Sequence, residues 1–547
     1  MKSITPIQAD RLKAKHFILP IIIFISLLIR LPGIGVGLPY TPDPREVLIA
    51  EDVLNLINFE SPPTIYNWPG TAWFYLIAIV GKTLSVFNVA LTNSSVILIG
   101  RYLNVLFGMG TVWFTFKLGN SLYNRQVGTI SAAFLAVTML HATNESRFAI
   151  VDIPATFCIT LFFYLLSRES NLRISTCLKL GLVAGVGIAI KYPTIFVLFS
   201  ILIYIKEEHF YRKLLLILSV CSLVFTVICP YWIIDSFSTE WNYFFNDFWY
   251  EAQHYNKGHF GLFTSSETGI IYRYLYLGTL LKWGMGFPLA ILVVCGLLWE
   301  FGKLVLSSPR IRNFVSKKYK EKMKKDFNPA NITRLGFGLL IFIITYFLFI
   351  GSYKVTFTRH LIILYPLLMI FASVFLCSFH RGFVLISGCI VWVISLVYTC
   401  AFASIMWTQP TGQEASEWIS ENIPVDIGIR RPPEVLCDWL YPELDRELTQ
   451  EISEWILITQ TDNDIFLKYY ENPQDFKPID WFPLDDVNIE ETLDFYELIW
   501  NEDNRYELIK TFQRQPSFLG IGFSDSTAPF PINSLLHPEI HLYKKIE

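Results

Sequence analysis

Long apolar stretches recur along most of this 547-residue chain, and they constrain its fold more than any other feature. Twelve such stretches cover residues 17–31, 70–90, 101–118, 127–141, 153–167, 176–190, 193–205, 213–232, 276–299, 335–351, 360–378 and 383–406. Charged residues make up only 17% of the chain, which is too little polar surface for a soluble protein of this size. Several stretches are shorter than the roughly 20 residues of a membrane-spanning helix, so their ends must extend into the polar flanks. The sequence therefore predicts an all-α polytopic membrane protein.

The basic residues predict how the chain is oriented. They cluster in the loops 119–126, 168–175, 206–213, 300–334 and 379–382. All five loops fall on the cytoplasmic side if the N-terminus is cytoplasmic and residues 70–90 do not cross, as the positive-inside rule requires. We therefore predict about 11 transmembrane helices, with residues 70–90 as a juxtamembrane or re-entrant segment on the outer side. The protein would be a multi-pass protein of the plasma membrane.

Residues 407–547 differ from the rest of the chain, because acidic residues outnumber basic ones there and no long apolar stretch occurs. Strand-like alternation and turn signals predict a small α/β domain, opened by a helix over Gln413–Asn422. We expect two parts, a membrane domain (1–406) and an extracytoplasmic domain (407–547). The first outer loop, 32–100, would carry juxtamembrane helices.

Cysteine and histidine give little indication of a metal. Eight of the nine cysteines lie in or beside apolar runs, and no CxxC motif is present. His254 and His259 in an outer loop lack the partner pattern of a metal site, so we assign them as acceptor-binding or supporting residues. No cofactor is expected, and a divalent metal is compatible with the sequence without being indicated by it.

The first outer loop holds an acidic candidate. Asp43 lies between Pro42 and Pro44, which fix the backbone, and Glu46 follows in the next turn. Carboxylates beside a membrane surface are costly unless they are paired or used. The loop is either a solvated acidic turn or the holder of a catalytic carboxylate.

Two further outer segments carry charges at the ends of predicted spans. Arg147 and Asp152 either pair with each other or serve separately, with Arg147 binding an anion and Asp152 orienting it or the acceptor. Lys191 ends a glycine-rich helix and either extends to the membrane surface or binds a phosphate. Tyr192 follows it as a supporting candidate.

The outer face would thus gather three acids and four cations. They are Asp43, Glu46 and Asp152, with Arg45, Arg147, Lys191 and Arg359. A hydroxyl becomes a good nucleophile when a carboxylate takes its proton, and a phosphate leaving group needs positive charge. One carboxylate base beside a group of cationic side chains therefore suits transfer of a group from a phosphate to a hydroxyl.

At these residues the sequence resembles the GT-C superfamily, and within it the family 39 glycosyltransferases. That group includes protein O-mannosyltransferases and bacterial aminoarabinose transferases. The stretches that carry the resemblance, in order, are Tyr40–Asp43, Tyr66–Tyr75, Arg101–Asp152, Gly181–Tyr192, Arg359–Pro366 and Glu414–Pro424. Their order and spacing are specific, whereas each alone is not.

The resemblance implies a GT-C fold and inverting transfer of a sugar from a polyprenyl-phosphate donor to a lipid, glycan or protein acceptor. Asp43 takes the place of the catalytic aspartate. The chain departs from the family where Pro44 replaces the usual glutamate and where His360 follows Arg359. The expected partners are the lipid-linked donor, the bilayer and an unknown acceptor, with no nucleic acid.

Two other functions stay open from the sequence. A transporter or channel would explain charges at membrane depth, but not their position at the outer ends of spans or the outer domain. A non-catalytic protein that binds lipid-linked sugar is the second alternative, because of Pro44.

Overall fold

The structure is a computed structural model. It describes residues 6–68, 70–169, 171–237, 243–257, 269–307, 334–435, 438–446, 448–449, 453–473, 489–500, 505–530 and 532–546. The basic run between residues 317 and 325, on which the predicted orientation depends, lies outside these ranges, as does His259. His254 lies in a described helix, but its side chain is not described.

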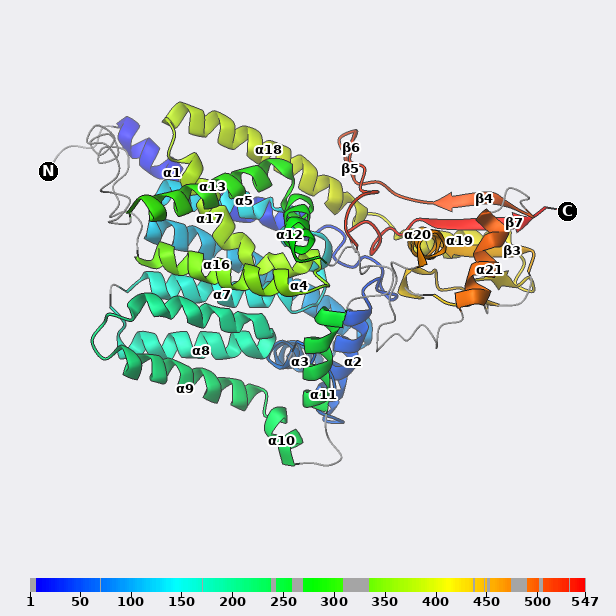
Figure 1. The fold of residues 1–547 in the computed structure, drawn as a ribbon, viewed down its shortest axis with the longest axis horizontal. Coiled ribbons are helices and arrows are strands. Elements are labelled where there is room, and N and C mark those ends of the chain that lie inside the picture. The colour runs from blue at the N-terminus through cyan, green and yellow to red at the C-terminus, as the bar shows by residue number, and fades with distance from the viewer. Residues whose placement is uncertain are drawn as a thin grey trace.

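A bundle of roughly parallel helices forms the larger part of the molecule (Figure 1). Its elements are α1 (Pro6–Arg30), α4 (Asn93–Leu122), α5 (Arg125–Ala136), α7 (Asp152–Ser167), α8 (Ile174–Ile190), η2 (Tyr192–Tyr204), α9 (Phe210–Ile228), α13 (Phe287–Ser307), α16 (Arg334–Ser352), α17 (Tyr365–Leu376) and α18 (Arg381–Ile405). Among the described residues, five helices are long and apolar enough to cross a membrane. Large apolar side chains on α9 and α18 are exposed, which is the pattern of helices that face lipid. The prediction of a mostly helical membrane fold is confirmed, whereas the count of 11 spans stays a prediction.

Glycines bring α8 and α9 into close contact. A β-carbon at Gly181 would lie 2.8 Å from the carbonyl oxygen of Ile217, and one at Gly185 would lie 2.7 Å from that of Cys221. Real β-carbons do not approach backbone so closely, so these positions accept only glycine at this helix separation. Close backbone approach through small residues is the usual means of packing helices within a membrane.

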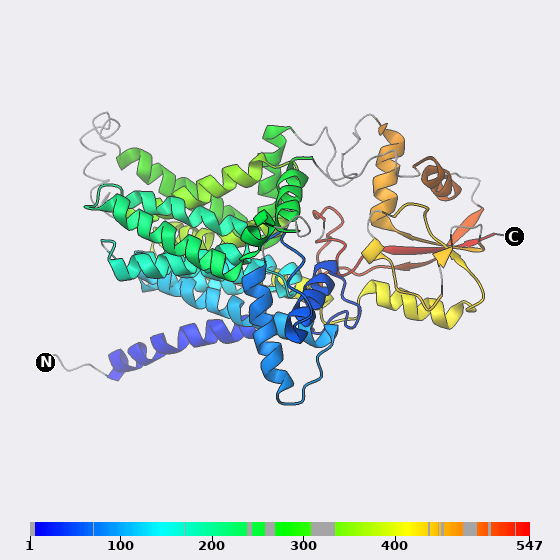
Figure 2. The ribbon, with the colours of Figure 1, turned by 90° about the horizontal axis from the view of Figure 1, so that it is seen from below.

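Short helices gather at one end of the bundle, which we call the site end. They are α2 (Pro44–Asn58), α3 (Thr71–Ser85), α6 (Met139–Ala142), η1 (Asn144–Arg147), α10 (Tyr231–Phe237), α11 (Tyr243–Lys257), α12 (Ile270–Met285) and η5 (Thr358–Leu364). Figure 2 shows α2 and α3 running across the bundle axis and not along it. Proline at the first position of α2 and the Asp43 side chain, which accepts from the Arg45 backbone N–H, explain where that helix begins.

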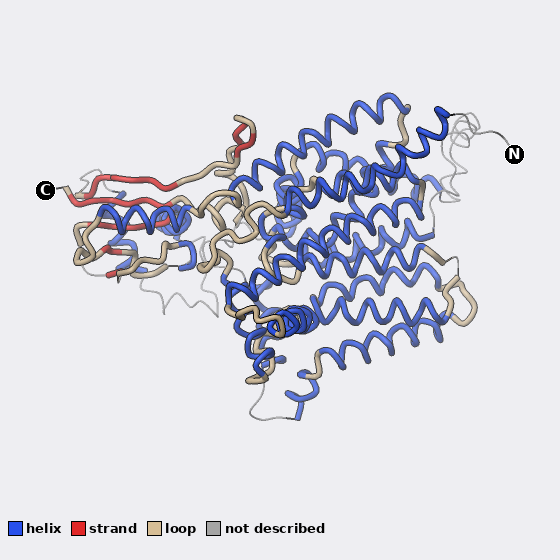
Figure 3. Tube along the Cα trace, turned by 180° about the vertical axis from the view of Figure 1, so that it is seen from behind, coloured by secondary structure: helices blue, strands red, loops and turns tan. Residues whose placement is uncertain are grey.

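The chain after α18 builds an α/β unit beyond the site end (Figures 1 and 3). Its sheet has the order β2-β1-β3-β7-β4, with β1 parallel to β2 and β3, and β7 antiparallel to β3 and β4. The strands are β1 (Ile429–Arg430), β2 (Leu448–Thr449), β3 (Trp455–Thr459), β4 (Tyr506–Phe512) and β7 (Ile540–Lys545), and β5 (Ser517–Phe518) pairs with β6 (Ile521–Gly522) in a separate hairpin.

Helices cover both faces of this sheet. The predicted opening helix is present as α19 (Thr411–Asn422), while α20 (Gln460–Glu471) and α21 (Ile489–Trp500) lie on the opposite face, and the turn η6 (Asp438–Leu440) precedes β2. Successive residues of β3 alternate between the two sides, so Leu457 packs with α19 and Ile456 with α20 and α21. All five residues of β3 are buried, because both faces of this central strand are covered by helices, and this gives the unit three layers.

The α/β unit is tied to the bundle by a segment between β6 and β7, which we call the strap (residues 523–530 and 532–537). Its side chains Ala528, Ile532, Leu535 and Leu536 are buried in the same apolar cluster as the bundle helices. The ring of Phe523 lies 5.4 Å from that of Tyr398 on α18. The unit is therefore packed onto the site end and is not joined to it by the chain alone.

The predicted orientation can be tested by labelling single cysteines in intact cells, after replacing the exposed native Cys389 and also Cys437, which lies in the predicted extracytoplasmic domain, with serine. A cysteine at Glu208, in the turn before α9 at the end opposite the strap, should be protected from a membrane-impermeant maleimide. A cysteine at Glu421 on α19 should react. Permeabilised cells should label both sites, and labelling of both in intact cells would show that the topology is wrong.

Candidate active site

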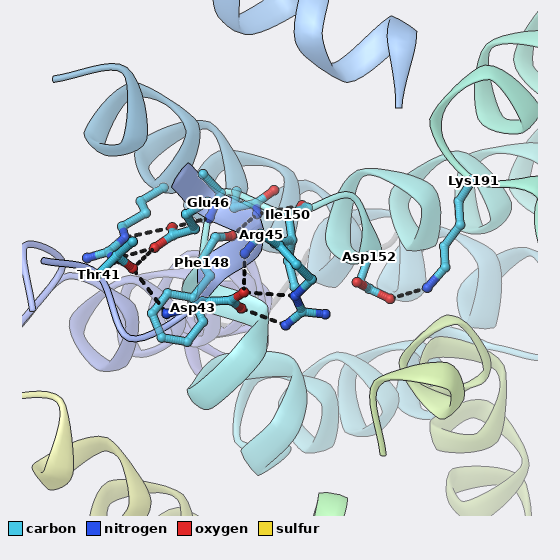
Figure 4. A network of polar contacts seen from close by, with 11 residues as sticks. Thr41, Asp43, Arg45, Glu46, Phe148, Ile150, Asp152 and Lys191 are labelled. Carbon is cyan, nitrogen blue, oxygen red and sulfur yellow. Dashed lines mark hydrogen bonds and ion pairs between the residues drawn. The ribbon is translucent and has the colours of Figure 1, made fainter. Parts of the chain in front are cut away.

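Asp43 is the N-cap of α2 and is completely buried. Both carboxylate oxygens are held by Arg45, with Nε 2.8 Å from Oδ1 and a terminal guanidinium nitrogen 2.6 Å from Oδ2 (Figure 4). The Arg45 backbone N–H adds a third bond of 3.0 Å to Oδ1. A two-pronged arginine–carboxylate pair of this kind fixes the direction of the carboxylate as well as its charge.

The protonation of Asp43 is set by opposing influences. Burial, the largest of them, raises the pKa of this carboxyl group, but the charge and hydrogen bonds of Arg45, together with the charge of Arg359, outweigh it. The net effect is a pKa below the usual range of aspartate. Asp43 is therefore a carboxylate at neutral pH.

Glu46 is equally buried but is fully occupied by structural contacts. Arg101 of α4 binds both of its oxygens, at 2.9 Å and 2.6 Å. The Ala149 backbone N–H and the Thr41 hydroxyl donate to the same carboxylate, at 2.6 Å and 2.5 Å. These contacts make Glu46 a structural anchor, which is compatible with the supporting role that the sequence predicted for this acid.

Arg101 extends this anchor to the first loop. Its guanidinium donates to the carbonyl oxygens of Ile34 and Val36 at 2.8 Å and 2.9 Å, and to the Thr41 hydroxyl at 3.1 Å. The ring of Phe148 lies 5.1 Å away under the guanidinium. One buried ion pair thus joins the loop before α2, the helix α4 and the segment before α7.

Asp152 and Lys191 form a second ion pair, from the start of α7 to the end of α8. The backbone at Lys191 is extended, so α8 ends there and the chain restarts as η2 with Pro193 in its first turn. This break turns the lysine toward Asp152. The alternative that Asp152 pairs with Arg147 is wrong.

A polar cavity of about 110 Å³ collects the candidate groups. It is lined by Arg45, Trp68, Ile150, Val151, Asp152, Lys191, Glu251, Arg359 and His360. Three of the four predicted cations and one of the three predicted acids therefore meet at one place. Asp43 does not line the cavity, because the Arg45 guanidinium lies between them (Figure 4).

A larger apolar cavity of about 480 Å³ adjoins the polar one. The two share Trp68, Lys191, Glu251 and His360. Its remaining lining is Asn67, Tyr192, Pro193, Ile195, Phe196, Phe248, Ala252, Tyr346, Phe349, Ile350 and Tyr353. A cationic chamber that opens into an aromatic and aliphatic one suits a ligand with a charged head and an apolar chain.

Arg147 is not brought to this site. Its side chain is buried and donates to the carbonyl oxygen of Pro32, and its other two nitrogens have no hydrogen-bond partner in the described part of the chain. Tyr192 lines the apolar cavity, and its hydroxyl donates to the Tyr66 carbonyl at 3.0 Å. Neither histidine proposed from the sequence, His254 or His259, can be placed, because their side chains are not among those described.

The structure adds Trp68 and Glu251 to the site, to which sequence reasoning gave no role. Trp68 lies in the Tyr66–Tyr75 stretch that carries the family resemblance, but no role was assigned to its side chain from the sequence. Two carboxylates fix that segment, since Asp52 accepts from Thr64 and Ile65, and Asp247 accepts from the Tyr66 N–H at 2.6 Å. Burial raises the pKa of both carboxyl groups.

Among the described residues, no group of three or more His, Cys, Asp or Glu side chains is arranged to hold a metal ion. The charges of Arg45, Lys191 and Arg359 instead supply positive charge to the polar cavity.

The anchor role of Glu46 predicts a large loss of stability in Glu46→Gln. Removing one partner of a buried ion pair leaves Arg101 unpaired and typically costs about 3–5 kcal/mol. Thermal melting of the purified protein should therefore show a clear fall, with Glu51→Gln on the exposed side of α2 as the matched control. An unchanged melting temperature in Glu46→Gln would rule out the anchor.

Comparison with known proteins gives one family match. Residues 71–234 match the family model described as dolichyl-phosphate-mannose-protein mannosyltransferase, which is less than a third of the chain. The matched segment includes Asp152 and Lys191 but neither Asp43 nor Arg359. No curated protein sequence matches the chain.

Two solved structures are similar in shape at low identity. ArnT from Cupriavidus metallidurans, bound to undecaprenyl phosphate, is 12% identical over 97% of this chain and 98% of its own, with a TM-score of 0.49. The oligosaccharyltransferase AglB from Archaeoglobus fulgidus, in complex with an inhibitory peptide and a dolichol-phosphate, is 12% identical over 75% of this chain and 58% of its own, with a TM-score of 0.44. The family match confirms the resemblance found in the sequence: this chain is similar to the GT-C membrane glycosyltransferases.

Proposed function

We propose that this protein is a glycosyltransferase that moves a sugar from a polyprenyl-phosphate donor to an acceptor hydroxyl on the outer face of the membrane. The observation that carries the proposal is the pair of joined cavities. Three cations line the polar cavity, and apolar side chains dominate the adjoining one. A phosphate bearing a long hydrocarbon chain matches both at once.

The polar cavity suits the donor phosphate. Arg45 and Arg359 offer planar, multiple N–H donors, and Lys191 adds a compact charge. Asp152 directs Lys191 into this position through their ion pair. The indole N–H of Trp68 has no hydrogen-bond partner among the described residues, so it is free to donate to the bound head group.

The apolar cavity suits the first isoprene units of the carrier. Phe196, Phe248 and Phe349 line it together with Ile195 and Ile350. Burying apolar surface stabilises a complex by about 25 cal/mol per Å², so several isoprene units contribute substantially to affinity. The carrier thus enters from the bilayer with its phosphate leading.

In the reaction, the acceptor oxygen forms a bond to the anomeric carbon as the bond from that carbon to the phosphate oxygen breaks. Asp43 takes the acceptor proton, and the polyprenyl phosphate leaves as an anion that the cations stabilise. A single displacement inverts the anomeric configuration and needs one carboxylate, unlike the pair used in glycoside hydrolysis. A metal ion is not required, because arginine and lysine supply the charge.

Arg45 couples donor binding to the base. Before the donor binds, Arg45 holds both oxygens of Asp43 and separates them from the cavity. A donor phosphate in the cavity attracts the same guanidinium, so it competes with Asp43 for Arg45. As Arg45 turns to the phosphate, Asp43 loses its partner and becomes both accessible and more basic.

Asp43→Asn tests the assigned chemistry. Asparagine is as good an N-cap as aspartate, so the fold should persist while the proton acceptor is lost. Loss of a general base lowers turnover by about 10²–10⁴. The measurement is consumption of a panel of labelled polyprenyl-phosphate sugars by membranes that contain the protein and supply its acceptor. It is normalised to the amount of folded protein, which a melting curve of the purified variant checks.

Two results would contradict the proposal. If the parent consumes none of the sugars but moves a solute across vesicles, it is a transporter, and if it binds donor without consuming it, it is a non-catalytic binding protein. Near-parental turnover in a folded Asp43→Asn would show that another group is the base.

The competition for Arg45 also predicts a pH effect. The free enzyme has a lowered pKa at Asp43, so kcat/KM should fall only below about pH 4, the ordinary range of aspartate. In the donor complex, Arg45 has moved away and a negative phosphate has arrived, and both changes favour the protonated carboxyl. The acid limb of kcat should therefore lie at higher pH than that of kcat/KM, and coincident limbs would contradict the coupling.

A further inference from the structure

A third cavity, of about 610 Å³, lies where the α/β unit meets the bundle. It is bounded by α20, the segment 513–515 after β4, the strap and Tyr276 of α12. None of its lining residues belongs to either cavity of the candidate active site. It is therefore a separate chamber, within the size range of pockets that take small ligands.

The packing of the strap holds this cavity in place. Ala528, Ile532 and Leu536 are buried among the bundle helices, so the polar side chains beside them face the cavity from a fixed backbone. On the bundle side, α12 carries Tyr276 and also packs against η5, which carries Arg359. A helix that lines the chamber thus contacts the element that carries Arg359.

Charged side chains around the chamber are compensated within the protein. Arg514 binds Glu414 at 3.0 Å, and His537 pairs with Asp525 at 2.6 Å. Asp464 accepts from the Gln460 amide at 2.6 Å. The chamber consequently lacks the cationic excess of the active-site cavity, which argues against a phosphate or another anion as its ligand.

Lys468 and Glu539, which carry opposite charges, also line the chamber, together with amides, hydroxyls and rings. Gln513, Gln515 and Asn533 can each donate and accept, as can the hydroxyls of Ser526 and Thr527. The amide oxygen of Asn533 is buried and has no hydrogen-bond partner in the described part of the chain, which leaves an acceptor unused.

Two aromatic rings also line the chamber. Tyr276 and Phe530 add apolar faces of the kind on which C–H groups pack. Neutral donors and acceptors at this density, beside aromatic faces, match a saccharide, because each of its hydroxyls both donates and accepts while its ring faces are apolar.

We propose that this chamber binds a neutral saccharide that forms part of the acceptor. The inference rests on the proposed function, since an acceptor is needed only if the protein transfers sugar. Binding there would hold an extended acceptor at the junction while its reacting hydroxyl reaches the polar cavity beyond η5.

The test uses the full-length protein in detergent and four probes: the methyl glycosides of glucose, mannose, galactose and N-acetylglucosamine. Saturation-transfer NMR should detect binding of at least one of them. Thr527→Trp places a large ring in the chamber, and Asn533→Ala removes the unused acceptor, so both should weaken that binding by about tenfold or more. Ser420→Trp, an equivalent change at an exposed position on α19 across the sheet, should leave it unchanged.

The outcomes separate the two proposals. If the parent consumes donor but binds no glycoside, or if a folded Thr527→Trp binds as well as the parent, the inference fails and the proposed function stands. If a glycoside binds in the chamber but no donor is consumed, the proposed function fails, and with it the role of the chamber in holding an acceptor. A methyl glycoside that fills the chamber does not also reach the polar cavity, so it should compete with the extended acceptor and slow donor consumption by the parent, with a weaker effect on Thr527→Trp. Displacement by inorganic phosphate would show an anion site and overturn the assignment.

Discussion

The buried pair of Glu46 and Arg101 is the interaction on which the site end depends. It joins the first loop, α4 and the segment before α7 at one point. A buried ion pair adds little net stability over an apolar contact, because both charges lose their hydration, but it strongly favours one arrangement in which every donor and acceptor is matched. Here that arrangement sets the start of α2, and therefore the direction of Asp43. Positioning, more than stability, explains why a charge pair occupies this place.

The candidate active site shows a different principle, because its charged groups are paired with one another beside a cavity that a charged ligand can occupy. Asp43 contacts Arg45 and Asp152 contacts Lys191, and Arg359 and Glu251 line the polar cavity as well. This arrangement is stable without ligand, because Asp43 and Asp152 each have a cationic partner. A bound phosphate is a stronger hydrogen-bond acceptor for the same cations, so it displaces the acids. The ion pairs therefore form in the ligand-free protein and break when the donor binds. The new contacts between the cations and the phosphate offset the energy of breaking them.

Sequence reasoning identified the residues whose chemistry is unusual for their surroundings. Asp43, Lys191 and Arg359 stood out as charges at span ends, and the structure places all three at or beside one cavity. It could not separate Glu46 from Asp43 or Arg147 from the other cations, because burial and hydrogen-bond partners depend on contacts across more than 50 residues of chain. Trp68 and Glu251 were missed for a related reason: an aromatic ring in an apolar segment and a glutamate in a polar loop are ordinary until folding brings them together. The long helices of the bundle were predictable, since apolar length specifies them, whereas α2 and α11 lie outside the apolar stretches.

The strap explains why the C-terminal part could not be placed from its sequence. Its α/β layers follow from strand periodicity and are closed around their own two apolar clusters. The strap, however, has no periodicity of its own, and Ile532 and Leu535 find their burial in the bundle instead. The strap is an irregular segment whose apolar side chains extend from the α/β unit into the bundle. It therefore creates a junction that neither part forms alone. Polar side chains on the same segment are thereby fixed at the boundary, and this explains how a chamber of hydrogen-bonding groups can exist between a sheet and a bundle of apolar helices.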